Sequence, residues 1–337
     1  MRNLFYLFAI LIVSCTTEVT DKDQFQKLTG PYLGQELPGD SAVLFAPHIV
    51  SSGMADRDIT ISPDGKELFF TRILGGFTYN TIFYTKQMNG IWSKPEVFKY
   101  CTDARYKYTE PFITIDGEKL FFASNKPVNG KEPASFDIWV CEKNENNEWG
   151  EPYNLGEPIN TDQNEFFPTL TADGTIYFNH FDAELNDEFI YRSKLVDGEY
   201  TSPEKLCEKV NAGQARFNAF IAPDESFIII PTYGMPDSKG ATDYYIVFRD
   251  EYDNWSNPIN MGEQINSENG QEWSASISPD GKYLFYMSAK IPEEQINTKD
   301  FSSDLFDQIH NSPQNGLSDI YWVSTDFIKE LKKQAKF

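Results

Sequence analysis

The sequence predicts an all-β protein, and three observations support this class. A Pro-Asp-Gly type of turn lies between two short apolar segments and recurs five times along the 337 residues. The second apolar segment of each copy is rich in Phe, Leu and Tyr, as is typical of a strand. Apolar residues make up 40% of the chain and aromatic residues 15%, which is enough to build a buried core.

Each repeat begins with a short strand and a tight turn. In the first copy, the strand at residues 58–62 leads into a turn in which Pro63 fits the second position and Gly65 the left-handed position. The fourth copy has Glu225 in place of the glycine, which predicts a strained turn. The five copies align on aspartates spaced 52, 57, 51 and 56 residues apart: Asp64, Asp116, Asp173, Asp224 and Asp280.

Three more strands complete the repeat. The second strand is strongly apolar, as in residues 68–70, and a variable loop separates it from the third. The third strands are expected at residues 81–85, 137–141, 189–193, 244–248 and 319–324. A fourth strand is expected to begin near an aromatic residue that a proline follows: Trp92, Trp149, Tyr200 or Trp255. Four short strands repeated radially are typical of a β-propeller, so we expect one propeller of four-stranded antiparallel blades.

The number of blades follows from the two ends of the repeat region. The fifth copy ends after its third strand, and residues 42–47 resemble an isolated fourth strand. This N-terminal strand would complete the last blade and close the ring, which leaves no unpaired sheet edge. Five blades are therefore expected, with six as the alternative.

The repeat also resembles a known family. The Pro-Asp-Gly hairpin and the Asp-Ile-Tyr/Trp third strand are similar to the WD40-like PD40 repeat of the TolB propeller and of many lipoproteins of the Bacteroidetes type. The resemblance covers residues 42–325. It implies a propeller that serves binding and assembly, and it specifies the fold but no ligand.

The N-terminus carries features of an export signal. Arg2 precedes an apolar run of ten residues at 4–13, which is too short to span a bilayer. The run ends in Ile12-Val13-Ser14-Cys15, which resembles the bacterial lipobox. We therefore expect a lipoprotein signal peptide at 1–14, a lipidated tether from Cys15 at 15–30 and the propeller at 31–337. The expected location is the bacterial cell envelope, at the outer membrane because Thr16 is not aspartate.

The charge balance limits the partners. The chain has 29 basic and 51 acidic residues, a net charge of −22. Such an acidic body does not suit nucleic acid, whose binding depends on neutralising phosphates, or an anionic lipid surface. The lipid anchor is thus the expected membrane contact, and the expected partner is an envelope protein, a peptide or a glycan. No metal or cofactor is expected, since the histidines lack zinc spacing and Cys101, Cys141 and Cys207 are expected to be buried apolar residues.

The loops between second and third strands vary in length, whereas the other face carries tight turns. The variable loops share a face with the start of each first strand, at the mouth of the central channel. We expect this long-loop face to bind a ligand. The candidate channel-mouth residues are Arg57, Asp58, Tyr108, Glu110, Glu165, Phe166, Arg216, Asn218, Glu272 and Trp273.

Two functions suit these residues. The first is a binding or scaffold module with no catalytic residue. The alternative is a glycoside-active enzyme that would use Glu110, Glu165 and Glu272 as acid, base or nucleophile. A competing interpretation is that Arg57 and Arg216 pair with these glutamates and plug the channel. The distances among these side chains decide between the interpretations.

Overall fold

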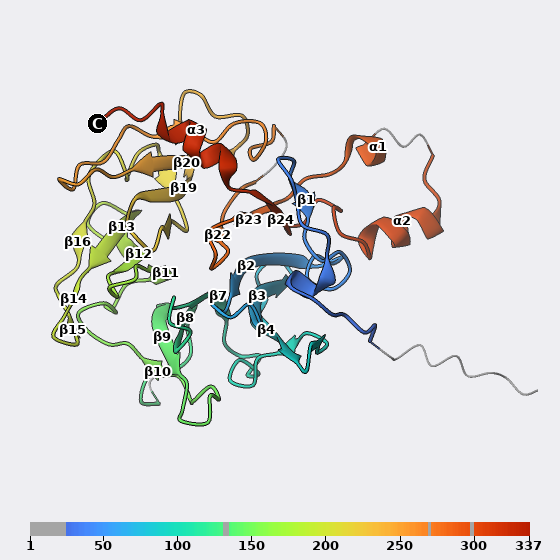
Figure 1. The fold of residues 1–337 in the computed structure, drawn as a ribbon, viewed down its shortest axis with the longest axis horizontal. Coiled ribbons are helices and arrows are strands. Elements are labelled where there is room, and N and C mark those ends of the chain that lie inside the picture. Colours follow the sequence, from blue (N-terminus) through green and yellow to red (C-terminus); the bar gives the residue numbers. More distant parts are fainter. Residues whose placement is uncertain (1–24, 131–134, 269–270, 297–299) are drawn as a thin grey trace, which may run out of the picture.

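The computed structural model describes residues 25–130, 135–268, 271–296 and 300–337. Five antiparallel sheets, each built on four strands in radial order, stand around a central axis, so the protein is a five-bladed β-propeller (Figure 1). The predicted fold class and the count of five are confirmed, and the six-blade alternative is wrong. The expected signal peptide and Cys15 lie outside the described residues.

In blades 1 to 4 the strands run outward from the channel in chain order. Blade 1 contains β2 (Ala55–Ile61), β3 (Glu67–Leu74), β4 (Tyr79–Met88) and β6 (Glu96–Val97); blade 2 contains β7 (Tyr108–Ile113), β8 (Lys119–Ser124), β9 (Asp137–Glu142) and β10 (Tyr153–Asn154). Blade 3 contains β11 (Glu165–Leu170), β12 (Ile176–Asp182), β13 (Asp187–Ser193) and β16 (Glu204–Lys205). Blade 4 contains β17 (Ala215–Arg216) with β18 (Phe220–Ile221), β19 (Phe227–Tyr233), β20 (Thr242–Phe248) and β21 (Ile259–Asn260). Blade 5 contains β22 (Ala275–Ile277), β23 (Tyr283–Ser288) and β24 (Asp319–Ser324).

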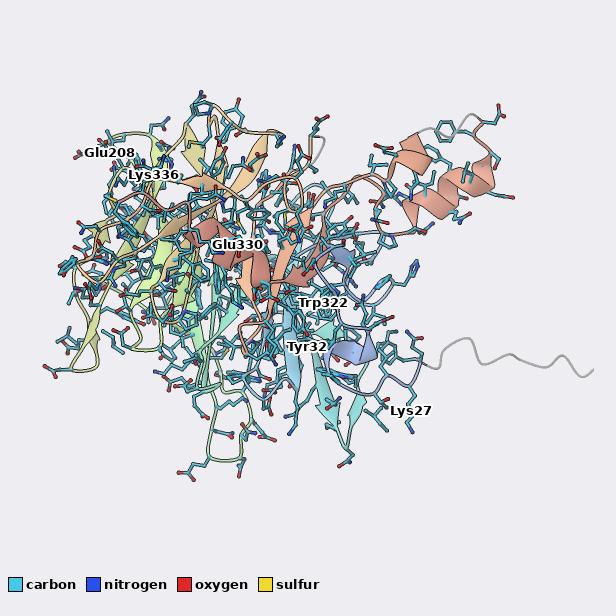
Figure 2. All side chains as sticks on the ribbon, turned by 45° about the horizontal axis from the view of Figure 1, so that its top comes forward. Lys27, Tyr32, Glu208, Trp322, Glu330 and Lys336 are labelled. Carbon is cyan, nitrogen blue, oxygen red and sulfur yellow. The ribbon has the colours of Figure 1, made fainter. Side chains whose placement is uncertain are left out.

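The N-terminal strand closes the ring as predicted. β1 (Val43–Leu44) pairs antiparallel with β24, with Val43 opposite Trp322. The next residue, Phe45, is fully buried and contacts Trp322 edge-on at a ring separation of 5.2 Å. A short 3-10 turn, η1 (Tyr32–Gly34), places the Tyr32 ring 5.2 Å from the ring of the same tryptophan. Both residues are labelled in Figure 2. Aromatic packing therefore reinforces the two-residue pairing that joins the ends of the domain.

The fourth strands begin later than predicted. Trp92 lies in β5 (Ile91–Trp92), a small extension of β4, and Trp149 bridges back to Lys143 at the end of β9. The fourth strands β6, β10, β16 and β21 each follow a proline three residues after the aromatic residue. Because proline has no backbone N–H and restrains the residue before it, the chain leaves the hairpin there and starts the outer strand.

The tight turns have the predicted conformation. Gly65 adopts a φ of +69°, in the left-handed region. Glu225 adopts the same region at +56°, and its carboxylate accepts hydrogen bonds from Tyr177 Oη at 2.7 Å and Arg249 Nη1 at 2.8 Å. A contact across two blades therefore accompanies the unfavourable backbone conformation.

Two of the variable loops expected between second and third strands are mostly strand in the structure. Blades 1 and 3 extend their hairpins, so that only residues 75–78 and 183–186 lie outside strands. The longest connection, in blade 5, carries α1 (Glu293–Ile296) and α2 (Ser303–His310), which project beyond the blades in Figure 1. A C-terminal helix, α3 (Asp326–Lys332), buries Ile328 against the core of blades 4 and 5.

The cysteines divide into two groups. Cys101 and Cys141 are buried in the core between blades 1 and 2, as predicted, and burial raises the pKa of the Cys141 thiol to about 12. Cys207 is exposed, which corrects the prediction for that residue. No helix among the described residues has the length and apolar character needed to cross a membrane.

Candidate functional site

The first strands are interrupted where they approach the channel mouth. In four blades, the residue six positions before the turn aspartate has a positive φ: Asp58 at 55°, Glu110 at 61°, Phe167 at 48° and Asn218 at 28°. The strand register shifts at this point in blades 1 to 3, and in blade 4 the strand divides into β17 and β18. A bulge of this kind redirects side chains. The interruption explains why Asp58, Glu110 and Asn218 meet.

A buried ion cluster lies at the centre of the channel. Arg57 Nε donates to Asp58 Oδ1 at 2.7 Å, and Arg57 Nη2 lies 3.6 Å from Glu110 Oε1. All three residues are 7% exposed or less. Burial raises the pKa of Glu110 to about 7, with a further increase from the neighbouring Asp58 charge and an opposing effect of Arg57. The two carboxylates thus share one guanidinium.

Glu110 also joins three blades through hydrogen bonds. Its Oε1 accepts from Asn218 Nδ2 at 3.0 Å, its Oε2 accepts from the Phe167 backbone at 2.8 Å, and its own N–H donates to Thr71 Oγ1 at 3.0 Å. The cavities lined by Asp58 measure only about 10 Å³ each. The channel is therefore filled by side chains at this level.

An aromatic cluster lies above the ion cluster. Trp273 stacks on Phe217 with ring centres 5.6 Å apart and planes 9° apart, and on Phe77 at 6.3 Å and 25°. The Arg57 guanidinium lies 5.9 Å from the Trp273 ring. Phe77 is 46% exposed, and Phe217 and Trp273 are partly exposed. We call Phe77, Phe217 and Trp273 the aromatic triad; sequence reasoning selected Trp273 but missed Phe77, which lies in a loop with no repeat signal.

Glu165 and Glu272 bind the linkers between blades. Glu165 Oε1 accepts from Thr161 Oγ1 at 2.7 Å and lies 2.8 Å from His180 Nδ1. Glu272 Oε1 accepts from the hydroxyls of Ser267 and Ser288, each at 3.0 Å. Burial raises the pKa of Glu272 to about 7. No described hydrogen bond or ion pair joins either side chain to Glu110 or Arg57.

The remaining candidates are distributed over different environments. Arg216 Nη1 pairs with Asp187 at 3.0 Å, so the expected pairing of Arg216 with a candidate glutamate is not found, whereas Arg57 does pair with Glu110. Tyr108 is 3% exposed and belongs to the core between blades 1 and 2. Phe166 packs on Phe136 at 4.9 Å.

Several buried polar atoms around the mouth have no hydrogen-bond partner among the described residues. They are Arg57 Nη2, Glu272 Oε2, Trp273 Nε1 and Ser274 Oγ. Buried polar atoms in proteins nearly always have a partner, so these atoms are available to a polar ligand or to water. The described residues contain no group of three or more His, Cys, Asp or Glu side chains that could hold a metal ion.

Comparisons with known proteins concern the fold. No protein-family model matches the chain, and no curated protein matches it. BT0996, in a complex with RGII, is 7% identical, with a TM-score of 0.50, and the match covers 89% of this protein and 92% of that one. Native Bacillus subtilis arabinanase Arb43A is 12% identical, with a TM-score of 0.46, over 83% and 97% of the two proteins.

A third match is less complete. The periplasmic gluconolactonase PpgL of Pseudomonas aeruginosa is 14% identical, with a TM-score of 0.36, over 68% of this protein and 64% of that one. The chain thus spans less than two thirds of the length of that relative. These likenesses bear on the propeller fold alone, and the PD40 resemblance stays a prediction.

Proposed function

We propose that this protein is a lipid-anchored binding or scaffold module of the cell envelope, whose long-loop face engages a protein, a peptide or a glycan. The single observation that carries the proposal is the aromatic triad over Arg57. Its three rings come from blades 1, 4 and 5 and meet at the channel mouth. Aromatic side chains contribute large contact areas to binding sites and stack on sugar rings or side chains of a partner.

The chemistry beneath the triad suits binding without reaction. Arg57 pairs with both Asp58 and Glu110, and side chains fill the channel below them. A ligand would therefore rest on the triad and the surrounding loops. Trp273 Nε1, which has no hydrogen-bond partner among the described residues, is a donor that suits an acceptor group on that ligand.

A glycoside-active enzyme is the second candidate, on the strength of Glu272. Its Oε2 is buried without a hydrogen-bond partner among the described residues, and its pKa of about 7 suits a general acid. Against this role, its other oxygen is held by two serines of the blade framework. If Glu272→Gln abolished a glycoside-cleaving activity while leaving the fold intact, the enzyme candidate would replace the binding module.

The proposed anchor is consistent with the path of the described N-terminal residues. The carbonyls of Leu28 and Gly30 accept hydrogen bonds from Trp92, so the last residues of the expected tether pack on blade 1. The proposal expects Cys15→Ser to move the protein from the membrane fraction to the aqueous fraction and to abolish labelling by an alkyne fatty acid. A Cys207→Ser control should leave both unchanged.

Binding is tested with the full chain in its native envelope. A photo-crosslinking amino acid at position 77 should trap a protein or peptide partner, and a glycan array should report a sugar ligand. Capture or array binding should fall about tenfold or more in Trp273→Ala, since an aromatic hot spot contributes at least about 2 kcal/mol. Tyr252→Ala serves as the control, because Tyr252 is 77% exposed in a turn of blade 4 outside the triad. Equal losses in both variants, or no ligand in either assay, would contradict the proposal.

A further inference from the structure

A cavity of about 750 Å³ lies between blades 2 and 3, on the face of the tight turns. Its walls come from the first turns of both blades, from residues 153–158 of blade 2, and from the hairpin of β14 (Leu195–Val196) and β15 (Glu199–Tyr200). A smaller pocket of about 100 Å³ lies at the turn-face end of the channel, and both cavities are lined by Thr114, Ile115 and Leu170. We call the two adjoining cavities the turn-face groove. None of the residues that line it belongs to the aromatic triad.

The turn-face groove exposes large apolar side chains. Ile115 is 48% exposed, Tyr153 44% and Leu195 40%, and all three line the cavity between blades 2 and 3. Leu155 and Tyr200 lie in the same wall and are partly buried. Exposed apolar side chains that gather in one place, with polar residues around them, mark interaction sites.

The blade fold does not require these apolar side chains. Leu195 pairs with Tyr200 in its hairpin. The residues that pair with the corresponding tryptophan in blades 1, 2 and 4 are polar or charged: Gln87, Lys143 and Arg249. In place of Ile115, the first turns of the other blades hold smaller side chains: Pro63, Ala172, Pro223 and Pro279. Because the same repeat folds with these residues, Leu195 and Ile115 can contribute to binding a partner.

Acidic residues predominate around the apolar side chains. The charged residues that line the cavity between blades 2 and 3 are four acids and one base: Asp116, Glu157, Asp173, Glu199 and Lys119. Lys119 is paired with Glu142 at 2.8 Å. A hydrogen bond from Thr171 lowers the pKa of Asp173, so this carboxylate is ionised at neutral pH. The groove therefore carries an excess of negative charge.

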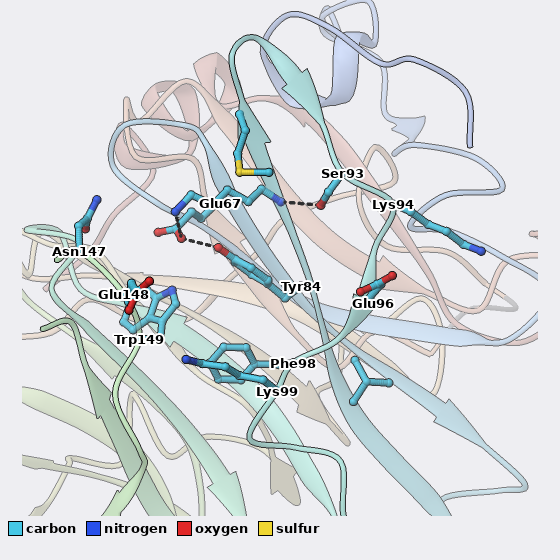
Figure 3. Close-up of a pocket in the computed structure, with 13 residues that line it drawn as sticks. Glu67, Tyr84, Ser93, Lys94, Glu96, Phe98, Lys99, Asn147, Glu148 and Trp149 are labelled. Atoms are coloured by element: carbon cyan, nitrogen blue, oxygen red, sulfur yellow. Dashed lines mark hydrogen bonds and ion pairs between the residues drawn. The ribbon is translucent and has the colours of Figure 1, made fainter. Parts of the chain in front are cut away.

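The corresponding cavity between blades 1 and 2 has a different charge. It measures about 500 Å³, and Figure 3 shows the side chains that line it. Its lining holds three acids and three bases: Glu67, Glu96, Glu148, Lys86, Lys94 and Lys99. The two cavities have the same place in neighbouring pairs of blades, so the excess of acids is a property of the groove between blades 2 and 3 and is not imposed by the fold.

From this arrangement we infer that the turn-face groove binds a peptide segment of a partner protein that carries lysine or arginine beside apolar side chains. The apolar side chains of the segment would cover Ile115, Tyr153 and Leu195, and one of them would enter the small pocket at the channel. Lysine and arginine suit the groove because their stems lie on apolar surface while their charged ends reach carboxylates around it. An acidic segment would meet charges of the same sign.

The test uses the full chain and three capped octapeptides in calorimetric titrations. The first alternates lysine and leucine, the second lysine and serine, and the third glutamate and leucine. The inference expects the lysine–leucine peptide to bind and the other two to bind at least about tenfold more weakly, because each lacks either the apolar contact or the charge contact. No binding of the lysine–leucine peptide, or equal binding of either other peptide, would overturn the inference.

Variants then locate the site. Glu157→Gln with Glu199→Gln removes two of the four negative charges and should weaken the lysine–leucine peptide about threefold or more. Leu195→Ser removes an exposed apolar contact and should weaken it about fivefold or more. Unchanged affinity in either variant would overturn the inference.

Matched controls separate the groove from the charge of the whole chain. Glu208→Gln with Glu251→Gln removes two exposed acids outside the groove, and Tyr252→Ser changes a 77% exposed side chain in the corresponding turn of blade 4. Both should leave the affinity unchanged, and losses equal to those of the groove variants would overturn the inference. Trp273→Ala should also leave it unchanged, so this outcome is independent of the proposed role of the long-loop face. A loss in Trp273→Ala would place the peptide at the aromatic triad and would count against the groove.

Discussion

Asn160 and Ile138 exchange two hydrogen bonds. The Ile138 N–H donates to Asn160 Oδ1 at 2.8 Å, and Asn160 Nδ2 donates to the Ile138 carbonyl at 2.9 Å. The linker asparagine thereby pairs with the third strand as a neighbouring strand would. The same exchange joins Asn211 to Ile190 and Asn266 to Tyr244. At the closure of the ring, the Ser51 hydroxyl donates to the Ile320 carbonyl and accepts from the Ile320 N–H.

Replacement of this asparagine should destabilise the propeller. Asn160→Ala leaves the buried N–H of Ile138 without this partner, while the Ile138 C=O keeps its hydrogen bond from the Leu155 N–H, so the free energy of unfolding should fall by about 1–3 kcal/mol. Urea denaturation followed by tryptophan fluorescence measures the change. Asn146→Ala, in an exposed turn, should change stability by less than about 0.5 kcal/mol. Similar effects of the two substitutions would contradict the structural role of Asn160.

The closure of the ring should depend on Phe45. Its side chain is fully buried against Phe285 and Trp322, at ring separations of 5.1 and 5.2 Å. Phe45→Ala should therefore cost about 3–5 kcal/mol, the usual range for removing a buried phenylalanine. Val43 in the same segment is 39% exposed, and Val43→Ala should cost much less. Hydrogen exchange should locate the loss of protection in β24 and β1, and a loss spread evenly over all blades would argue against a closure role.

The ion cluster in the channel should behave as a coupled unit. Arg57→Met leaves Asp58 and Glu110 buried without their cation, which should destabilise the fold by about 3–5 kcal/mol. Adding Glu110→Gln to Arg57→Met removes one of the two uncompensated charges and should recover part of the loss. A double-mutant cycle by chemical denaturation gives the coupling energy. If the effects of the two substitutions on the free energy of unfolding were additive, the contact between Arg57 and Glu110 would contribute no coupling energy.

Asp319 should make stability depend on pH. Burial raises its pKa from 3.8 to about 7, with a smaller contribution from Asp56, and its Oδ1 has no hydrogen-bond partner among the described residues. Between about pH 4 and pH 7 the folded protein therefore holds a proton that the unfolded chain has released. The stability from this group is fully present below the unfolded pKa, and it is lost as the pH rises through 7.

The substitution Asp319→Asn isolates this effect. An uncharged amide removes the penalty for a buried charge, so the variant should gain stability relative to the natural protein at pH 8 and gain less at pH 5. Urea titrations of both proteins at the two pH values measure the difference. Asp64→Asn is the control: the pKa of that exposed turn carboxyl is lowered, so the group is ionised in both states at pH 5 and at pH 8, and the substitution should change stability equally at the two pH values. A gain for Asp319→Asn that is the same at both pH values would show that its charge has no part in stability.

Predictions that depend on residues close together in the chain agreed with the structure. Predictions of contacts between side chains of different blades agreed only in part. The left-handed φ at Gly65 and the third strands follow from residues close together in the chain. The ion partner of Arg216 did not follow, because Asp187 reaches it from another blade. Likewise, Glu225 occupies a glycine position and accepts a hydrogen bond from Arg249, and the sequence of the turn does not predict that contact.

By itself, the sequence determined the repeat, the five blades and the N-terminal strand that closes the ring, because turn preferences and strand patterns act over a few residues and recur five times. Only the tertiary structure decided that Glu110 joins Arg57 in the channel while Glu165 and Glu272 bind linkers. It also decided that Phe77 joins Trp273. The physical reason is that the bulges change the direction of the side chains in the first strands, and the repeat pattern does not predict by how much. Side chains separated by up to about 200 residues then meet according to that direction.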